Sequence, residues 1–482
     1  MTTSAAGAQL AGLAGQRICV AGLGITGQSV IKLLSAQGAL VTAVDSRDDQ
    51  ERQQVAAGLE RSGVTVRLGS AELGPGAVVP PGTALVVTSP GLRPDTGLLA
   101  DAVASGVEVI GDVELAWRLR PELPDGSRQQ WLAITGTNGK TTTVRMLAAM
   151  LAAAGKRSIA AGNVGTPILA AVTEPEPYPV VAVELSSFQL YWSSTVAPLA
   201  AAVLNIAAHH LDWHDDIESY VAAKSRIFAA GSIAIFNADD PRSAAMAAAA
   251  TQVRRRVAFR LGPPGPGEVG VADGWLTDYA FGPGSLPLAA ADSVRPPAPH
   301  NVADALAAAA LARAYGCEPE AIAAGLDAFQ PEPHRIAEVA VIGAVTYIDD
   351  SKASNPAAAA ASLAAFPKIV WIAGGLCRAT DADLDALIAG AHPRLRAAVL
   401  LGADRGRFRE ALARHAPDVP VTEVAGTDTG VMDLVVAQAA RLAQPEDTVL
   451  LAPAAQSFDM FRDYPARGEA FAAAVARLAA SR

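Results

Sequence analysis

Seven consecutive residues have the types and the order of a phosphate-binding loop. They read Gly136-Thr137-Asn138-Gly139-Lys140-Thr141-Thr142, between an apolar stretch, Trp131 to Ile134, and an alanine- and methionine-rich stretch, Thr142 to Ala154. A loop between a strand and a helix gathers backbone N–H groups around a phosphate. Lys140 would add a positive charge for the outer phosphates, and the Thr141 hydroxyl would supply a ligand for Mg²⁺.

This loop is shorter than the usual pattern, because the position of the first glycine holds Ile134. A bare G-x-x-G-K-T sequence is also compatible with an ordinary tight turn. The flanking strand and helix favour a nucleotide, so we predict an ATP site.

Groups that could hold a metal follow two later apolar stretches. Glu184 stands at the C-terminal end of a strand predicted over 180–185, where a carboxylate could bind Mg²⁺ or lie in a solvated turn. After the next strand, predicted over 200–206, come His209, His210, Asp212 and His214. Their spacing matches no zinc motif, so we expect one imidazole to complete a magnesium shell and the others to be structural. Lys224, on a predicted helix, would by itself be read as a surface lysine.

Polar side chains gather again after a strand predicted over 345–348. This segment reads Asp349-Asp350-Ser351-Lys352-Ala353-Ser354-Asn355-Pro356. Ser351 or Asn355 as a helix cap is one interpretation, but the density of carboxylate, amine and hydroxyl groups favours a binding site. The segments 374–378 and 457–459 follow strands of the same predicted sheet, so the three could line one anion-binding cleft.

The beginning of the chain predicts a βαβ unit of the dinucleotide-binding type. A strand over 18–21 leads into the turn Gly22-Leu23-Gly24-Ile25-Thr26-Gly27, a helix over 29–36 and a second strand that ends at Asp45. A nucleotide diphosphate could bind at the N-terminus of that helix. The Asp45 carboxylate could bind a ribose hydroxyl or cap a loop. Ser89-Pro90-Gly91 follows a further strand, at the edge where parallel sheets hold ligands.

These segments divide the chain into three α/β domains, as its length of 482 residues allows. We predict a Rossmann-like N-terminal domain over 1–117 and a central P-loop ATPase-type domain with a mainly parallel sheet over 118–331. A second Rossmann-like domain follows over 332–482. A proline-bearing linker, 120–128, separates the first two. The glycine- and proline-rich part 258–299 predicts an irregular or small antiparallel excursion.

Composition and charge limit the possible partners. Hydrophobic residues make up 51 % and charged residues 18 % of the chain, which is typical of a globular protein. The net charge of −10 argues against nonspecific binding to nucleic acid or anionic membranes. We find neither a membrane-spanning stretch nor a signal-peptide pattern in 1–15. Cys19, Cys317 and Cys377 lack metal-ligand spacing and fit buried thiols. We expect a cytoplasmic monomer.

The motifs, taken in order, resemble those of the Mur ligase family, ATP-dependent amide-forming enzymes of peptidoglycan precursor synthesis. The resemblance covers nearly the whole chain and is strongest to the D-glutamate-adding type. Besides the two glycine turns and 350–355, it includes Gly162-Asn163-Val164-Gly165, 183–190, 204–212, His300-Asn301 and His334-Arg335. It implies that D-glutamate is joined to UDP-N-acetylmuramoyl-L-alanine through an acyl phosphate, with ATP and Mg²⁺, and that domains close over the substrates.

The resemblance also implies a role for each matched residue. The uridine nucleotide would face Thr26, Asp45, Ser46 and Arg47, and the rest of that substrate Asn163 and Ser186. Mg²⁺ would be held by Thr141, Glu184, His210 and a carbamylated Lys224. ATP would be bound by the loop from Gly136 to Thr142 and by Asn301, Arg335 and Asp350. The incoming glutamate or the reacting phosphoryl group would be surrounded by Lys352, Ser354, Arg378, Ser457 and Tyr464. The catalytic set would be Lys140, Glu184, His210, Lys224 and Lys352.

Four positions depart from the family pattern. His209 replaces an acid, Asp304 an adenine-side asparagine, Arg378 a lysine and Tyr464 a phenylalanine. An arginine at 378 would replace a point charge by a bidentate pair with a carboxylate.

Three alternatives remain open at this point. A sibling ligase could add a different amino acid, although the Asp-Asn-Pro-Arg motif of the diamino-acid-adding type is absent from the sequence. A nucleotide-binding scaffold could have lost catalysis, although Lys140, Glu184, His210 and Lys224 are all present. A dinucleotide-dependent oxidoreductase would account for the first glycine turn but not for the ATP loop.

Overall fold

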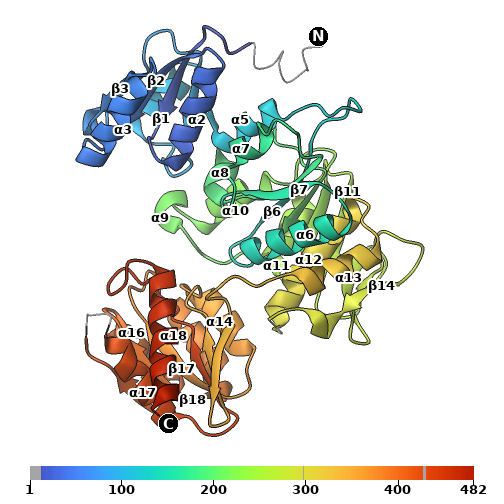
Figure 1. Ribbon diagram of the computed structural model, residues 1–482, viewed down its shortest axis with the longest axis vertical. Helices are drawn as coiled ribbons and strands as arrows, with labels where there is room; N and C mark the ends of the chain where they lie inside the picture. Colours follow the sequence, from blue (N-terminus) through green and yellow to red (C-terminus); the bar gives the residue numbers. More distant parts are fainter. Residues whose placement is uncertain (1–11, 297, 427–429, 482) are drawn as a thin grey trace. The chain divides into compact units, whose positions relative to one another are not determined.

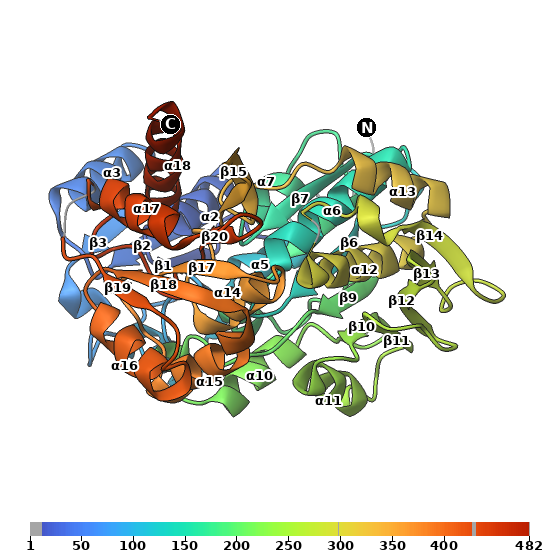
Figure 2. The same cartoon turned by 90° about the horizontal axis from the view of Figure 1, so that it is seen from below.

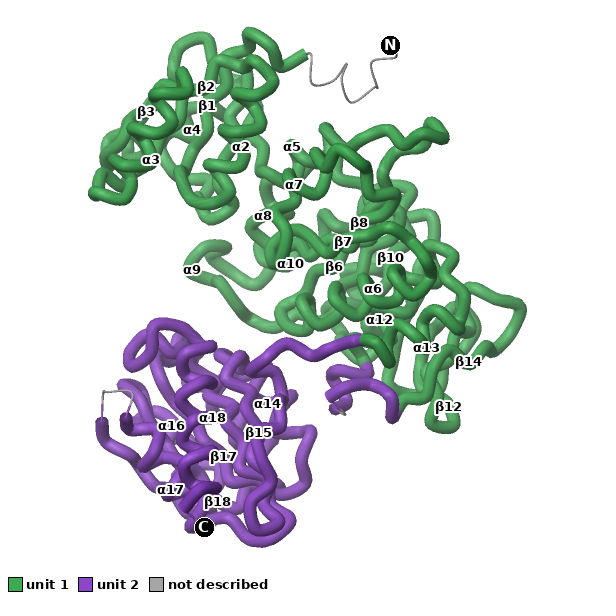
Figure 3. The backbone as a smooth tube through the Cα atoms, viewed as in Figure 1, with its two compact units in different colours: residues 1–291, 303–328 green, residues 292–302, 329–482 purple. Residues whose placement is uncertain are grey.

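The computed structural model describes residues 12–296, 298–426 and 430–481. Most of the N-terminal segment considered for a signal peptide, 1–11, lies outside the described residues. Two compact units are formed, one from 1–291 and 303–328 and the other from 292–302 and 329–482 (Figure 3). The first expected domain and most of the second thus belong to one unit. The domain boundaries expected at 117/118 and 331/332 stay predictions.

The first part of unit 1 is a parallel sheet in the order β3-β2-β1-β4-β5 (Figure 1). The central strands are short apolar runs buried on both faces, which is typical of a parallel sheet covered by helices. Its strands are β1 (Arg17–Ala21), β2 (Leu40–Asp45), β3 (Thr65–Leu68), β4 (Leu85–Thr88) and β5 (Glu108–Gly111). Its helices are α2 (Ile25–Ala36), α3 (Gln50–Glu60), η1 (Ser70–Glu72), α4 (Gly97–Ala104) and α5 (Asp112–Leu119).

The predicted βαβ unit is confirmed, with one difference at its helix. Helix α2 begins at Ile25, four residues before the predicted start, so half of the glycine turn is helical. The turn is tight there, because a Cβ added at Gly27 would lie 1.8 Å from the carbonyl oxygen of Gly22.

The second part of unit 1 is a nine-stranded sheet in the order β14-β13-β12-β11-β10-β9-β6-β8-β7. It is parallel from β7 to β12, and β12, β13 and β14 pair antiparallel. The antiparallel character predicted for 258–299 is therefore confirmed, and these strands extend the main sheet. The strands are β6 (Gln130–Thr135), β7 (Ser158–Gly162), β8 (Val180–Glu184), β9 (Ala200–Val203), β10 (Ile233–Asn237), β11 (Arg255–Phe259), β12 (Glu268–Ala272), β13 (Trp275–Asp278) and β14 (Leu286–Ala290).

The helices in this part of the chain carry several of the predicted site residues, and residues 292–302 among them belong to unit 2. They are α6 (Lys140–Ala153), α7 (Ile168–Val172), α8 (Ser187–Tyr191), α9 (Leu211–His214), α10 (Ile217–Ser225), α11 (Pro241–Ala249), η2 (Ala291–Ser293), α12 (Pro299–Ala314) and α13 (Pro319–Ala328).

Within unit 1 the two sheets are joined by a buried carboxylate. The side chain of Glu114 on α5 has no exposed area, and it accepts hydrogen bonds from the backbone N–H groups of Ser194 and Thr195 at 2.8 and 2.9 Å. Arg118 on the same helix donates to it at 2.9 Å. A buried carboxylate is tolerated when hydrogen bonds and a charge partner replace its water, as they do here.

Unit 2 has a six-stranded sheet in the order β15-β16-β20-β17-β18-β19, parallel except for β15. Helices α14, α15 and α16 cover one face and α17 and α18 the other (Figure 2). The strands are β15 (Ala337–Ile342), β16 (Val345–Asp349), β17 (Ile369–Gly374), β18 (Leu395–Leu401), β19 (Val421–Glu423) and β20 (Thr448–Leu451). The helices are α14 (Pro356–Ala364), α15 (Asp381–Ala391), η3 (His392–Arg394), α16 (Arg405–His415), α17 (Val431–Leu442) and α18 (Tyr464–Ala480).

Two composition-based expectations can be compared with the structure. The three cysteines are buried free thiols, and burial raises the pKa of Cys19 to about 12. Across the described ranges, none of the helices combines the length and apolar character needed to cross a membrane.

Helices α6 and α13 pack closely through a glycine. A Cβ added at Gly325 on α13 would lie 2.5 Å from Cα of Met150 on α6, nearer than packed atoms approach. Helix α13 therefore packs directly against α6, the helix that follows the phosphate loop.

We predict that Gly325→Ala lowers the free energy of unfolding by about 1–3 kcal/mol, because overpacking forces the two helices apart. Urea denaturation followed by tryptophan fluorescence measures the change. The control is Gly58→Ala on α3, where only the end of the Arg61 side chain lies at 4.0 Å. In that variant we expect the free energy of unfolding to rise by about 0.5–1 kcal/mol, because alanine favours a helix more than glycine does. Equal stability of the two variants would contradict the packing argument.

Candidate active site

The phosphate loop lies between β6 and α6, as the sequence predicted. Gly139, the residue before α6, has φ +83°, a left-handed conformation that side chains other than glycine rarely adopt. The amide of Asn205 at the end of β9 holds the loop from one side: its Oδ1 accepts from Asn138 N at 2.9 Å, and its Nδ2 donates to Asn138 O at 3.1 Å. The ammonium group of Lys140 donates to the carbonyls of Gly136 and Thr137, both at 3.0 Å.

Thr137 fixes the loop from the other side. Its hydroxyl is 3.0 Å from the Tyr220 hydroxyl on α10, and it accepts from Ala207 N at 3.0 Å. Thr137, Thr141 and Thr142 are all buried. The loop is thus rigidly supported by the strand end after β9 and by α10.

Glu184 lies at the C-terminal end of β8 and joins two other predicted site residues. Its Oε2 accepts from the Thr141 hydroxyl at 3.0 Å, and its Oε1 accepts from Asn163 Nδ2 at 3.1 Å. The side chain is buried, with the residue 1 % exposed. Ser186, two residues on, caps α8 in a capping box with Gln189.

Lys224 is a buried residue of α10, and the interpretation as a surface lysine is wrong. It is 1 % exposed, and its Nζ donates to Thr135 Oγ1 at 3.0 Å and to Gly136 O at 2.9 Å. Both acceptors are neutral oxygens at the junction of β6 and the phosphate loop. Burial lowers the pKa of this amine well below its usual value, the charge of Lys140 lowers it further, and Glu184 opposes both.

Of the three histidines that follow β9, His210 is exposed, His209 is half-buried and His214 is buried. His210, at φ +56°, precedes the short helix α9, and its ring packs 4.8 Å from that of Phe188. His214 is buried, and its Nε2 lies 2.9 Å from Ser187 Oγ. Burial lowers the pKa of His209 to about 3 and that of His214 to about 4, so both are neutral near pH 7. His214 fits the structural role expected for it.

The oxygen atoms at this edge of the sheet are of the chemical type that binds a hard cation. Within the described ranges, no group of three or more His, Cys, Asp or Glu side chains that could hold a metal is found. The Thr141 hydroxyl and Glu184 carboxylate are nevertheless in contact, and both are oxygen ligands of the kind Mg²⁺ prefers with waters completing its shell. The four-residue metal set of the sequence analysis stays a prediction.

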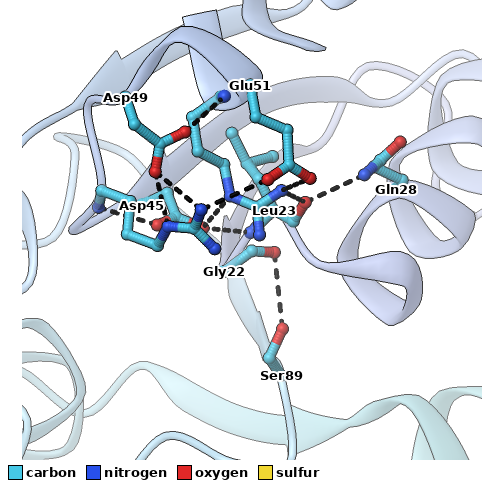
Figure 4. A network of polar contacts seen from close by, with 9 residues as sticks. Gly22, Leu23, Gln28, Asp45, Asp49, Glu51 and Ser89 are labelled. Carbon is cyan, nitrogen blue, oxygen red and sulfur yellow. Dashed lines mark hydrogen bonds and ion pairs between the residues drawn. The ribbon is translucent and has the colours of Figure 1, made fainter. Parts of the chain in front are cut away.

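The first glycine turn is stabilised by Asp45 (Figure 4). One carboxylate oxygen accepts from Leu23 N at 2.7 Å, and the other accepts from Arg47 N at 2.9 Å. Ser89 Oγ donates to Gly22 O at 3.4 Å from the end of β4. Asp45 therefore caps the loops at this edge in the structure, which was one of its two interpretations. The exposed Arg47 pairs with Asp49 and Glu51, and the roles expected of Thr26 and Ser46 stay predictions.

The segment after β16 in unit 2 contains both a cap and a cluster of charged groups. Asn355 caps α14 by accepting from Ala358 N at 2.9 Å, so the interpretation as a helix cap is confirmed for this residue. Lys352 Nζ lies 3.8 Å from the centre of the Tyr464 ring, a cation–π contact. The tyrosine at 464 thus supplies the aromatic face against which the lysine packs.

Residues expected to contact ATP in unit 2 lie in ordered, partly buried surroundings. Asp350 is buried and accepts a hydrogen bond from Ser362 Oγ, and burial raises its pKa to about 6. Arg335 donates a hydrogen bond to Glu332 at 2.9 Å. Its two neighbours in the chain, His334 and Ile336, both have a left-handed φ. Asn301 is buried and donates to Pro296 O at 3.0 Å.

The remaining predicted residues of unit 2 follow the strand ends of the same sheet. Ser457 is buried after β20, and Arg378 is exposed after β17. Ser354 donates its backbone N–H to Lys352 O at 2.8 Å. Asp304, in unit 1, lies against the phosphate loop: a Cβ added at Gly139 would lie 2.2 Å from its Oδ1.

Three supporting residues were not assigned a role from the sequence. Tyr220 and Asn205 hold the phosphate loop, and Arg467 on α18 bonds to the segment after β16. Asn205 lies just after a strand, and a polar residue at the carboxyl end of a parallel strand is a signal by which its role could have been predicted. Tyr220 and Arg467 lie inside helices and leave no local signal.

Unit 1 thus defines a phosphate-loop nucleotide-binding α/β protein with an acid and a buried lysine beside the loop. Comparisons with known proteins agree with this class. Three family models match the chain: the Mur ligase MurD-like N-terminal domain at 16–111, the Mur ligase middle domain at 134–312 and the Mur ligase glutamate ligase domain at 334–455. The chain belongs to the Mur ligase family, whose members are ATP-dependent amide-forming ligases.

Relatives in sequence and in structure support that conclusion. The UDP-N-acetylmuramoylalanine–D-glutamate ligase of Thermobifida fusca is 56 % identical, over 97 % of this chain and 99 % of its own. The protein of the same name from Streptomyces avermitilis is 52 % identical, with the same coverage. The structure of the UDP-N-acetylmuramate-alanine ligase of Thermotoga maritima matches with a TM-score of 0.55 at 18 % identity, over 97 % of this chain and all of that one. The last likeness is one of fold.

We predict that Asp350→Asn stabilises the ligand-free protein at neutral pH. The pKa of Asp350 is raised from 3.8 to about 6, so the stability of the wild type is full below pH 4 and falls as pH rises toward and through 6. The variant has no charge to bury at this position. The difference in free energy of unfolding between variant and wild type should therefore grow to about 2–3 kcal/mol at pH 7.5. Urea denaturation between pH 4 and 7.5 measures it.

The control for that series is Glu410→Gln, an exposed position on α16, which we expect to change stability by less than about 0.5 kcal/mol at each pH. A difference between Asp350→Asn and wild type that stays constant over the range would show that Asp350 does not ionise in a buried site.

Proposed function

We propose that this chain is an ATP-dependent ligase that joins D-glutamate to UDP-N-acetylmuramoyl-L-alanine in peptidoglycan precursor synthesis. The observation that carries the proposal is the match along nearly the full length of both chains to relatives with that name. The phosphate loop, Glu184 and the buried Lys224 support it independently, because they form one contiguous site at the ends of β6 and β8.

The reaction needs an activated carboxylate, because a carboxylate is a poor electrophile. The alanyl carboxylate oxygen attacks the γ-phosphorus of ATP, the bond from that phosphorus to the bridging oxygen breaks, and an acyl phosphate and ADP result. The amine of D-glutamate then attacks the acyl carbon, phosphate leaves, and the amine loses a proton. Positioning and charge neutralisation supply most of the acceleration in such phosphoryl transfers.

The residues of unit 1 would bind and activate the phosphates. Backbone N–H groups from Gly136 to Thr142 would surround them, and Lys140 would turn its ammonium group from the loop carbonyls to the phosphoryl oxygens. Mg²⁺, held by Thr141, Glu184, His210 and a modified Lys224, would neutralise the charge that develops during transfer. Asn163 already bonds Glu184, so it would orient the acid as well as face the substrate.

Lys224 would serve this site as a carbamate. Its neutral amine and CO₂ form an N-carboxylate and release one proton, which replaces a basic nitrogen by an anionic oxygen ligand. The buried amine beside two neutral oxygen acceptors supports the proposal, because a free ammonium group gains little at such a position.

Residues of unit 2 would bind the amino acid, and three others would contact ATP. Lys352, held against Tyr464, would stabilise the acyl phosphate or the amino-acid carboxylate. Arg378 would bind a carboxylate of D-glutamate, together with Ser354 and Ser457. Asn301, Arg335 and Asp350 would contact ATP.

The first sheet would bind the uridine nucleotide. Thr26 lies on α2 just after its start, Asp45 is the last residue of β2, and Ser46 and Arg47 follow it, so all four belong to one edge of that sheet. Ser186 would face the remainder of this substrate. We also infer that the enzyme acts in the cytoplasm, where ATP and nucleotide-activated precursors are available, and that it acts as a monomer.

Phosphate release with ATP, Mg²⁺ and UDP-N-acetylmuramoyl-L-alanine, across a panel of amino acids, tests the function. We expect release with D-glutamate alone. Release with a different amino acid would keep the ligase mechanism but assign another substrate and direct attention to Arg378. No release with any amino acid, although ATP binds, would favour a nucleotide-binding scaffold.

We predict that Lys140→Ala lowers ADP formation by at least about 1000-fold, because transfer loses its positive charge at the phosphates. Binding of the UDP-substrate, measured by calorimetry, should change by less than about twofold. The matched control is Lys156→Ala, just beyond the end of α6 in the same unit, which should retain wild-type turnover. Wild-type turnover in Lys140→Ala would contradict the assignment of the loop.

We predict that Lys224→Ala loses activity by a similar factor and that short carboxylic acids such as acetate partly restore it. The added carboxylate would occupy the space of the missing carbamate and supply the anionic oxygen. Turnover with and without acetate measures this rescue. Full activity without an additive would exclude a carbamate ligand, and rescue by methylamine instead would indicate that the free amine is the working form.

A further inference from the structure

Arg467 is a fully buried arginine in unit 2. It lies one turn into α18, the residue is 1 % exposed, and it is among the largest buried side chains of the described chain. Its three donor nitrogens all bond to protein oxygens: Nε to Ser351 Oγ at 3.0 Å, Nη2 to Ser351 O at 2.8 Å and Nη1 to Ala455 O at 3.0 Å.

These bonds join the ends of two neighbouring strands. Ser351 follows β16, and Ala455 follows β20, which pairs with β16 in parallel. The residue after Ser351 is Lys352, and two residues after Ala455 is Ser457. The third strand end is also in contact, because a Cβ added at Gly375 after β17 would lie 3.4 Å from Arg467 Nη1. One guanidinium group therefore lies beneath three segments that carry predicted substrate residues.

The helix that carries Arg467 is in close contact with the same edge of the sheet. A Cβ added at Gly468 would lie 2.1 Å from Nδ1 of His334 and 2.6 Å from Oδ2 of Asp349. Ser351 Oγ also donates to Tyr464 O at 2.8 Å, and the Tyr464 ring contacts Lys352. The first turns of α18 thus form the support on which the segment after β16 rests.

Stability alone gives little reason for an arginine at this position. Its nearest acceptors are two carbonyls and a hydroxyl, and burial lowers the pKa of the guanidinium group to about 10, with Asp459 and Asp349 opposing the shift from further away. Replacement of a buried charge by an apolar side chain of similar volume is often neutral or stabilising for a fold. What the planar guanidinium provides and an apolar residue lacks is a fixed geometry between three oxygens.

We propose that Arg467 is a positioning residue for the amino-acid side of the reaction, fixing the segment after β16 against the segment after β20 and thereby placing Lys352 and Ser457. The proposal deepens the function proposed above and rests on it. Arg467 itself would touch neither reacting atoms nor substrate.

The test compares variants on one helix. Arg467→Met removes the three donors, and Arg467→Lys keeps the charge but loses the planar fork. Arg477→Met makes the same change at an exposed position of α18, where the arginine pairs with Asp433. Phe471→Leu, at a fully buried position of that helix in the hydrophobic cluster that α17 and α18 form against the sheet, lowers stability.

The first measurement is kinetic, with ATP and UDP-N-acetylmuramoyl-L-alanine saturating. We expect kcat/KM for D-glutamate to fall about 10- to 100-fold in both Arg467 variants, since small misplacements of reacting groups cost rates of that order. KM for the UDP-substrate should change by less than about twofold. Both control variants should keep wild-type kinetics. An equal fall in Phe471→Leu at matched thermal stability would overturn the proposal.

The second measurement is amide hydrogen exchange of the ligand-free proteins, which needs no activity. In Arg467→Met we expect faster exchange confined to 351–355 and 454–458, and in Arg467→Lys the same pattern. Faster exchange spread evenly over unit 2, or no change, would overturn the proposal even if kinetics changed. If the wild type shows no D-glutamate-dependent phosphate release, the proposed function fails, whereas the exchange result still decides whether Arg467 ties the two segments together.

Discussion

The site depends on one buried amine at the junction of β6 and the phosphate loop. Lys224 Nζ bonds to the last residue of the strand and to the first carbonyl of the loop, while the loop itself is held by Asn205 and Tyr220. A lysine in such a place is costly to bury as a cation. The charge of Glu184, which contacts Thr141, also acts on this amine. Conversion of the amine to a carbamate would remove the buried cation and add an anionic oxygen ligand.

The two compact units use parallel sheets in the same way. Because the carboxyl ends of parallel strands meet at one edge, residues distant in sequence gather there: Glu184 with Thr141 in unit 1, and Lys352 with Tyr464 in unit 2. In each unit a helix behind the edge supplies the supporting side chain. Lys224 on α10 does so in unit 1, and Arg467 on α18 in unit 2. Under the proposed function both arrangements would serve one reaction, the activation of a carboxylate and its capture by an amine.

The sequence predicted what local chemistry determines. Strand, glycine loop and helix around Lys140 follow from adjacent residues, as do the cap at Asn355 and the first βαβ unit. What local patterns could not show depends on distant partners. Arg467 bonds to Ser351, 116 positions away, and Lys224 to Thr135, 89 positions away. Residue type alone predicted a surface position for Lys224, and its burial shows that this prediction is wrong. Only the family resemblance gave this lysine a role. The early start of α2 depends on a close approach of Gly27 to Gly22 that composition does not reveal.

We propose that the phosphate loop serves to phosphorylate a carboxylate of the UDP-substrate. Transfer of ¹⁸O tests it most directly. UDP-N-acetylmuramoyl-L-alanine with both alanyl carboxylate oxygens labelled is incubated with ATP, Mg²⁺ and D-glutamate, and the released phosphate is analysed by mass spectrometry. We expect one ¹⁸O in the phosphate for each amide bond formed, because the attacking carboxylate oxygen leaves with the phosphoryl group. Unlabelled phosphate accompanying amide formation would show that ATP is cleaved without an acyl phosphate, and would contradict this role of the loop.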